Sequence, residues 1–239
     1  MPGMGSRGSA AELEGARVVD FPLCGEWMAV HTPGSRIPSH GTDMLGQRYA
    51  YDLIRFDPRK EGRYHPAGGL RTLLVGVPTR ECHGWGEPIH APLDGLVIAA
   101  RDGLPERARI HPVREIALVL KNGLTFRPTP QHLHRVLGNH VILRCGGVYA
   151  GFAHLTTGSV AVEAGQQVRA GDVLGRVGHS GNSTAPHLHF QLMDGPDPLT
   201  ARGVPCAFRA YEAWRDGAWR RVENGIPKST ERIRSVGGR

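Results

Sequence analysis

Short apolar runs separated by turn-forming residues make up most of the chain. In residues 48–56 (RYAYDLIRF) and 187–193 (HLHFQLM), apolar and polar side chains alternate, as they do in half-buried β-strands. The dipeptides Gly146-Gly147 and Asp216-Gly217 each separate two such runs and predict hairpins. No segment shows a convincing amphipathic helical period. We therefore predict an all-β fold with an antiparallel, sandwich-like core of short strands.

The pattern divides the chain into three parts. Residues 1–16 are small, polar and glycine-rich, and we expect them to form a disordered leader. Residues 17–206 are expected to form one β-rich domain. Residues 207–239 add a hairpin followed by a basic tail.

Two stretches inside the predicted domain are expected to be loop excursions. The first, at about 57–85, is polar and rich in proline and glycine. The second, at about 104–138, contains one predicted strand, Glu115–Lys121, which the Asn122-Gly123 turn ends.

Composition agrees with strands joined by turns, because 239 residues include 33 Gly and 18 Pro but only 6% aromatics. The formal net charge of +7 indicates an anionic partner, such as nucleic acid, a membrane surface or an acidic wall polymer. The arginines are scattered, and no basic helix or aromatic stripe indicates a specific nucleic-acid surface. The charge thus indicates an anionic partner without naming one, and we expect no specific nucleic acid.

The N-terminus, the lengths of the apolar runs and the cysteines bear on the cellular compartment and on the kinds of metal site that the sequence allows. The N-terminus lacks the apolar segment of a signal peptide, and no run approaches the length of a membrane span. The sequence thus predicts a cytoplasmic chain or export by another route. Cys24, Cys82, Cys145 and Cys206 form no C-x-x-C pair, which argues against a zinc ribbon and leaves two disulfides or free buried thiols.

One stretch, Gly175–Gln191, joins a glycine-rich turn to the sequence His187-Leu188-His189. Residues i and i+2 of a β-strand point to the same face, so the two imidazoles would project side by side. Such a pair suits a divalent metal or hydrolytic chemistry. Two surface histidines would have the same spacing, and H-x-H alone favours that interpretation; the motifs around it reverse the preference.

Four motifs follow one another over residues 86–193. They are GEPIHAPLDGLV at Gly86–Val97, a loosely matching AGFAHL at Ala150–Leu155, the glycine-spaced Val162–Gly181, and STAPHLHF at Ser183–Phe190. In this order they resemble the lysostaphin-type zinc endopeptidases, which cut peptidoglycan cross-bridges. The resemblance implies a duplicated hybrid-motif architecture, a Zn²⁺ cofactor, peptide substrates in peptidoglycan, and export, which is usual in the family.

The resemblance also implies three metal ligands. His189, the second histidine of H-x-H, and Asp52, within YAYD, match two of them. The family's third ligand stands four residues before the aspartate, where this chain has Arg48, which cannot bind zinc. We predict that His40 replaces it, because glycines in the intervening loop permit tight turns.

Two non-ligand histidines carry the catalytic role in the resemblance, and they match His154 and His187 here. His179 is close enough in sequence to line the mouth of a cleft. The remaining histidines that match no motif position are expected to be exposed or structural: His83, His90, His111, His132, His134 and His140.

Two other functions stay open at this point. Because of Arg48 and the missing signal peptide, the chain could be a degenerate member of the family that binds or regulates without hydrolysis. The glycine-spaced stretch 162–178 is also similar to biotinyl or lipoyl carriers and to phosphocarriers. Carriers need an exposed lysine in a hairpin, however, and no lysine occurs between residues 122 and 227.

Overall fold

The computed structural model describes residues 13–57, 63–66, 72 and 75–236. The predicted leader therefore lies outside the described residues except for 13–16, and its disorder stays a prediction. Much of the predicted excursion at 57–85 also lies outside them.

Most of the strands join one large sheet that is antiparallel except for the pair β1 and β14. Across the sheet the order is β1 (Arg17–Val19), β14 (Cys206–Arg215), β16 (Arg232–Ser235), β2 (Glu26–His31), β3 (Tyr51–Ile54), β12 (Leu188–Met193), β9 (Val148–Leu155), β8 (Asn139–Cys145), β6 (Gly95–Arg101) and β10 (Gln167–Val168). Two further strands pair off this path, β13 (Gly203–Val204) with β12 and β15 (Ala218–Gly225) with β14. The predicted all-β class is confirmed.

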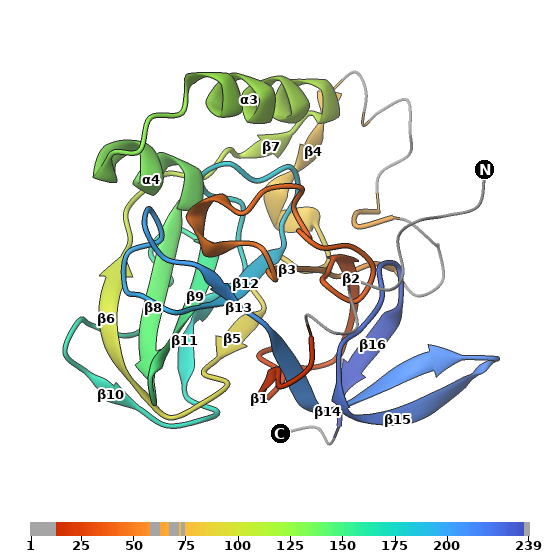
Figure 1. The fold of residues 1–239 in the computed structure, drawn as a ribbon. Helices are drawn as coiled ribbons and strands as arrows, with labels where there is room; N and C mark the ends of the chain where they lie inside the picture. The colour runs from red at the N-terminus through yellow and green to blue at the C-terminus, as the bar shows by residue number, and fades with distance from the viewer. Residues whose placement is uncertain (1–12, 58–62, 67–71, 73–74, 237–239) are drawn as a thin grey trace, which may run out of the picture.

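Smaller elements surround this sheet. Two small sheets pair β11 (Val173–Arg176) with β5 (Pro88–His90), and β4 (Val77–Pro78) with β7 (Arg109–Ile110). Among the elements that the structure describes in full are the helices α3 (Pro112–Thr125) and α4 (Pro130–Leu137) and the short 3-10 turns η1 (Met44–Gly46) and η2 (Thr79–Glu81). The helices α3 and α4 lie together at one end of the molecule, and the β14–β15 hairpin projects at the other (Figure 1). No helix within the described ranges is long and apolar enough to cross a bilayer.

Strand β12 occupies the centre of the sheet and is buried along its whole length. Leu188, Phe190 and Leu192 point into the main hydrophobic core. Because side chains alternate along a strand, His189 and Gln191 point to the opposite face. One strand therefore contributes to the core and to a polar cluster at the same time.

The segment 104–138 corrects the sequence prediction. It is not a loop excursion, and Glu115–Lys121 is not a strand, because α3 and α4 fill much of it. The run of Ile, Val and Leu suggested a strand, but Pro112 stands at the first turn of α3 and Thr129 caps α4 by accepting a hydrogen bond from the backbone N–H of His132. These start signals outweigh the β-propensity of the apolar run.

The C-terminal part follows the prediction only in its first half. β14 and β15 form the expected hairpin around Asp216 and Gly217, and β8 and β9 form the one around Gly146 and Gly147. Within the expected basic tail, residues 232–235 form β16 between β14 and β2, so this part of the tail belongs to the main sheet. The four cysteines are free thiols, and burial raises the pKa of Cys82 and Cys206 to about 12.

Phe208 packs at the junction between β14 and the central strands, and its substitution tests the packing of this core. It is 0% exposed, and its ring centroid lies 4.9 Å from that of Tyr51 and 5.0 Å from that of Phe21. Truncating a buried phenylalanine leaves a cavity, so we expect Phe208→Ala to lower the free energy of unfolding by about 3–5 kcal/mol. Urea denaturation measures this change. Val173→Ala, at a 42% exposed position, is the control, and an equal loss in both variants would contradict the proposed packing.

Candidate metal centre

Three adjacent strands bring one carboxylate between two histidines. In the register of the sheet, Asp52 of β3 lies opposite His189 of β12 on one side and His31 of β2 on the other. A register shift in β2 after Ala29 puts His31 there, since regular pairing would place Val30 opposite Asp52. The result is a row of three polar side chains across the sheet.

Four imidazoles surround the carboxylate of Asp52, which is only 7% exposed. His31 Nδ1 lies 2.8 Å and His40 Nε2 2.9 Å from Oδ2. His189 Nδ1 lies 2.9 Å and His187 Nε2 3.4 Å from Oδ1. Burial opposes ionisation of Asp52, but the neighbouring imidazoles outweigh it and hold the pKa of this carboxyl well below its usual range. The site is therefore built around a buried negative charge.

The loop between β2 and β3 folds His40 back onto Asp52, as the sequence predicts. Arg48, which stands where the family has its early histidine, forms an ion pair at 2.6 Å with Asp43 of the same loop. Gly46 has a φ of 69° and passes so close to Met193 that a Cβ there would lie 2.8 Å from the Met193 side chain. His40, twelve residues before Asp52, thus places an imidazole beside the carboxylate, as a histidine four residues before Asp52 would in the family.

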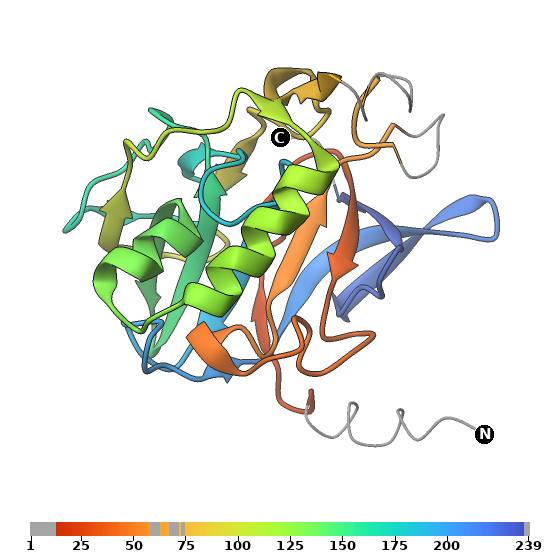
Figure 2. The same ribbon diagram turned by 90° about the horizontal axis from the view of Figure 1, so that it is seen from above.

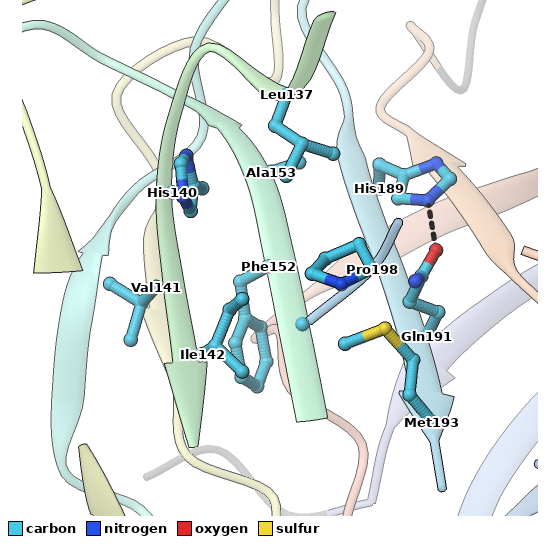
Figure 3. Close-up of a pocket in the computed structure, with 11 residues that line it drawn as sticks. Leu137, His140, Val141, Ile142, Phe152, Ala153, His189, Gln191, Met193 and Pro198 are labelled. Atoms are coloured by element: carbon cyan, nitrogen blue, oxygen red, sulfur yellow. Dashed lines mark hydrogen bonds between the residues drawn. The ribbon is translucent and has the colours of Figure 1, made fainter. Parts of the chain in front are cut away.

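Hydrogen bonds on the outer side of His189 determine which of its nitrogens faces Asp52. Gln191 Nε2 donates to the carbonyl oxygen of Leu45 at 2.8 Å, which turns Gln191 Oε1 toward His189. His189 Nε2 lies 2.8 Å from that oxygen and must donate to it (Figure 3). The lone pair of the neutral ring is then on Nδ1, the nitrogen that faces the carboxylate.

A small, mainly apolar cavity backs this hydrogen bond. Its volume is about 10 Å³, and Phe152, Ala153 and Pro198 are among the residues that line it beside His189 (Figure 3). His189 and Gln191 are both buried, and an apolar surrounding strengthens the hydrogen bond between them because little water competes for it.

His40 is held in the same way. Ser39 Oγ donates to the carbonyl oxygen of Gln47 at 3.2 Å, so it accepts from His40 Nδ1 at 3.0 Å. Burial lowers the pKa of His40 and favours the neutral ring, whose lone pair on Nε2 faces Asp52. Two lone pairs and a carboxylate that face one another repel unless a cation lies among them. The donor set of His40, Asp52 and His189 therefore fits a zinc ion with its outer hydrogen bonds already in place.

His31 belongs to the site and was missed by sequence reasoning. One ring nitrogen of His31, one of His40 and a carboxylate oxygen of Asp52 all lie within 4.8 Å of one another. Its side chain is 56% exposed, and the hydrogen bond to Asp52 raises its pKa. Within the described part of the chain its Nε2 has no hydrogen-bond partner that would fix a tautomer, so Nδ1 is free to donate to the carboxylate. Only the shifted register of β2 reveals His31, and a sequence does not show register.

A β-bulge turns His154 into the site. Ala153 lies opposite His189, so a regular strand would point the next side chain to the other face. Instead, two residues of β9, Ala153 and His154, lie opposite one residue of β8, and His154 adopts a φ of 66°. A non-glycine residue in this region costs on the order of 1–3 kcal/mol. The bulge brings the His154 ring centroid to 4.9 Å from that of His187.

Both of these rings donate through Nδ1 to a backbone carbonyl. His154 Nδ1 lies 2.9 Å from Ser180 O, and His187 Nδ1 lies 2.7 Å from Ala185 O. Burial, together with the neighbouring imidazoles, holds the pKa of His154 well below its usual value. Burial also acts to lower the pKa of His187, but the charge of Asp52 outweighs it and raises that pKa. One ring is therefore kept neutral, while the other favours its protonated form.

His179 does not line the mouth of a cleft, because it is 0% exposed. His132 and His134, expected in a loop, lie on α4. His140 is buried and donates from Nδ1 to Gly138 O at 2.7 Å, in agreement with the structural role predicted for it.

A family model described as Peptidase family M23 matches residues 82–201. The chain belongs to this family. The matched segment contains His154, His187 and His189, whereas His40 and Asp52 precede it. The predicted resemblance to lysostaphin-type peptidases is thereby confirmed. His154, His187 and His189 lie in the part of the chain that defines the family.

Two curated relatives agree with the M23 assignment. The chain is 35% identical over 180 residues to the peptidoglycan DD-endopeptidase ShyA of Vibrio cholerae, which covers 72% of this chain and 33% of ShyA. It is 41% identical over 102 residues to the DD-carboxypeptidase/endopeptidase Mpg of Neisseria meningitidis, covering 38% of this chain and 23% of Mpg. The chain thus spans a third or less of either relative. The catalytic domain of lysostaphin from Staphylococcus simulans aligns at 22% identity with a TM-score of 0.33, over 59% of this chain and 84% of that domain.

Acid should destabilise the fold partly through His140, next to the site. Burial lowers the pKa of His140 to about 4. The unfolded chain binds this proton near pH 6.5, so the wild type loses stability as the pH falls from about 6.5 to about 4. We expect His140→Asn, which does not titrate, to reduce this loss by about 3 kcal/mol. Urea denaturation at pH 7 and pH 4 measures it, and equal losses in both proteins would contradict the prediction.

Proposed function

We propose that this chain is a zinc-dependent endopeptidase that hydrolyses peptide bonds in peptidoglycan cross-bridges. The observation that carries the proposal is the arrangement of His40, Asp52 and His189, in which outer hydrogen bonds aim both imidazole lone pairs at one buried carboxylate. Membership of a peptidase family and the match to ShyA support the same function.

In this proposal His40 Nε2, Asp52 and His189 Nδ1 hold the zinc ion. When bound, zinc polarises a substrate carbonyl and lowers the pKa of a water molecule toward neutrality. His31 stays outside this set and donates a hydrogen bond to Asp52, which orients the carboxylate.

His154 and His187 divide the proton transfer between them. Hydrolysis needs a group that takes a proton from water and a donor for the oxyanion that develops on the carbonyl. The neutral ring of His154 offers a lone pair on Nε2, because its Nδ1 hydrogen is bound to Ser180 O. His187, whose protonated form is favoured beside Asp52, suits the donor role through its Nε2.

The substrate class follows from the relatives' names and the charge. Those names specify DD-endopeptidase activity, so we propose a DD-bond of the peptide cross-bridge as the first bond to test. The net charge of +7 favours retention near anionic wall polymers. Because the cross-bridge lies in the wall, the proposal also requires the chain to reach that compartment.

The alternative function is a degenerate family member that binds without hydrolysis. Its main support was the missing histidine four residues before Asp52, and the return of His40 to the carboxylate weakens that support. Incubation with purified peptidoglycan separates the two functions. New DD-cleaved peptides on chromatography support the proposal, whereas zinc binding with no cleavage of DD-linked or oligoglycine peptides supports the alternative.

Substitutions in β12 separate ligand from catalyst. We expect His189→Ala to lose both zinc and hydrolysis, because it removes a ligand. We expect His187→Ala to keep its zinc and lose about 10²–10⁴-fold in turnover, the usual contribution of a proton-transfer group. Metal analysis and peptide cleavage measure the two quantities. Zinc lost from His187→Ala but kept by His189→Ala would reverse the assignment.

The two upstream histidines give a second test. His40→Ala should abolish stoichiometric zinc binding. His31→Ala should keep the zinc but weaken its affinity by about 10–100-fold, since an outer hydrogen bond to a ligand is lost. Titration against a competing chelator measures both affinities. If His40→Ala bound zinc as tightly as the wild type, His40 would not be a ligand.

A further inference from the structure

Four polar side chains lie behind His187, on the side away from Asp52. They are Arg107, Glu115 of α3, His179 and Ser183, and the last three are at most 2% exposed. A buried carboxylate is costly unless it is paired and hydrogen-bonded. Hydrophobic packing alone therefore does not account for the burial of these four polar side chains.

The guanidinium of Arg107 fixes the protons of this cluster, because it can only donate. Its Nε donates to Glu115 Oε2 at 2.8 Å, and its Nη2 donates to the carbonyl oxygen of Ser183 at 2.8 Å. Nη2 also lies 3.1 Å from His179 Nε2, nearer than Glu115 Oε2 at 3.5 Å, so this nitrogen accepts from Arg107. The hydrogen of the His179 ring is consequently on Nδ1.

The same logic continues to His187. Ser183 Oγ gives its only hydrogen to Ala185 O at 2.7 Å, so it accepts from His179 Nδ1 at 3.0 Å. His187 Nδ1 lies 3.2 Å from that hydroxyl and 2.7 Å from Ala185 O. Both neighbours of this nitrogen accept, which requires a hydrogen on Nδ1. His187 Nε2 is left as the nitrogen that faces the carboxylate of Asp52.

Helix α3 is attached to the turn 177–187 at two places. Besides the ion pair of Glu115 with Arg107, Asn122 Nδ2 donates to Asn182 Oδ1 at 2.9 Å. Arg107 reaches the same turn directly, through Gly181 O at 2.9 Å. Seen from above, α3 lies across this end of the molecule (Figure 2). The helix thus has a defined contact with the segment that leads into β12.

We propose that Arg107, Glu115 and His179 are positioning residues that hold the turn before His187 and keep the His187 hydrogen on Nδ1. The inference rests on the proposed function, because the role of His187 as a proton-transfer group belongs to it. None of the three touches the reacting atoms in this scheme. They act through Ser183 and the Ala185 carbonyl.

The test uses a graded pair of substitutions at His179 in the zinc-loaded full chain. His179→Phe keeps a ring but removes both hydrogen bonds. His179→Asn keeps an N–H donor near the position of Nδ1, so it can still donate to Ser183. We expect His179→Phe to lower kcat by about 10–100-fold with KM and zinc content unchanged, and His179→Asn to recover part of that loss.

Nitrogen-15 NMR of the imidazoles reads the same effect without any substrate. The spectra are recorded at a pH high enough for the His187 ring to be neutral. There we expect its single hydrogen on Nδ1 in the wild type and a mixture of both tautomers in His179→Phe. Glu115→Gln, nearly isosteric and therefore a mild change to the fold, should shift the tautomer and kcat in the same direction by less. Arg114→Gln, at the exposed neighbouring position on α3, is the matched control and should change neither.

The outcomes separate the two proposals. A wild type that cleaves no peptide overturns the proposed function, while the tautomer measurement still decides the positioning role. If His179→Phe and Glu115→Gln both keep the Nδ1 hydrogen of His187 and the wild-type kcat, the positioning role is wrong. A loss of kcat that Arg114→Gln shares equally would also overturn it, because the effect would then be a general one of α3.

Discussion

A carboxylate buried among imidazoles is the constraint from which the rest of the site follows. Asp52 is ionised although it is only 7% exposed, and that is stable only if positive charge or hydrogen-bond donors surround it. His31 of β2 and His187 of β12 can donate hydrogen bonds to it. His40 and His189 instead turn lone pairs toward it, an arrangement that suits a metal cation among the three groups. The sheet order that places β3 between β2 and β12 is therefore also what makes the centre.

The nitrogens that face inward are selected by contacts on the outside. Gln191, Ser39 and two backbone carbonyls each take the outer hydrogen of one histidine. In the proposed function, these outer contacts are what allow histidines a few ångströms apart to differ in role, as metal ligands or as proton-transfer groups. His40, His154 and His187 present Nε2 and carry a hydrogen on Nδ1. His189 has the reverse arrangement, because its partner Gln191 lies on the same strand.

The sequence allowed a good part of this to be predicted, for physical reasons that differ between residues. His154, His187 and His189 lie in local motifs, and the strands that carry them have a clear alternating pattern. His40 was accessible because glycines mark a flexible path back to Asp52. His31 was not, since its place depends on a register shift that no local pattern encodes. Helix α3 was misread because its apolar run has high β-propensity, and so Glu115 and its contact with His179 were missed as well.

The bulge at His154 has a consequence for anyone who would transfer this site to another scaffold. A regular antiparallel sheet, however well it reproduced the positions of Asp52 and His189, would present the side chain at position 154 on the wrong face. The designer would have to include one unpaired residue in the strand that corresponds to β9, and a left-handed backbone conformation at the residue that corresponds to His154. The irregularity in β9 is thus part of the specification of the site, and idealising the strand would erase it.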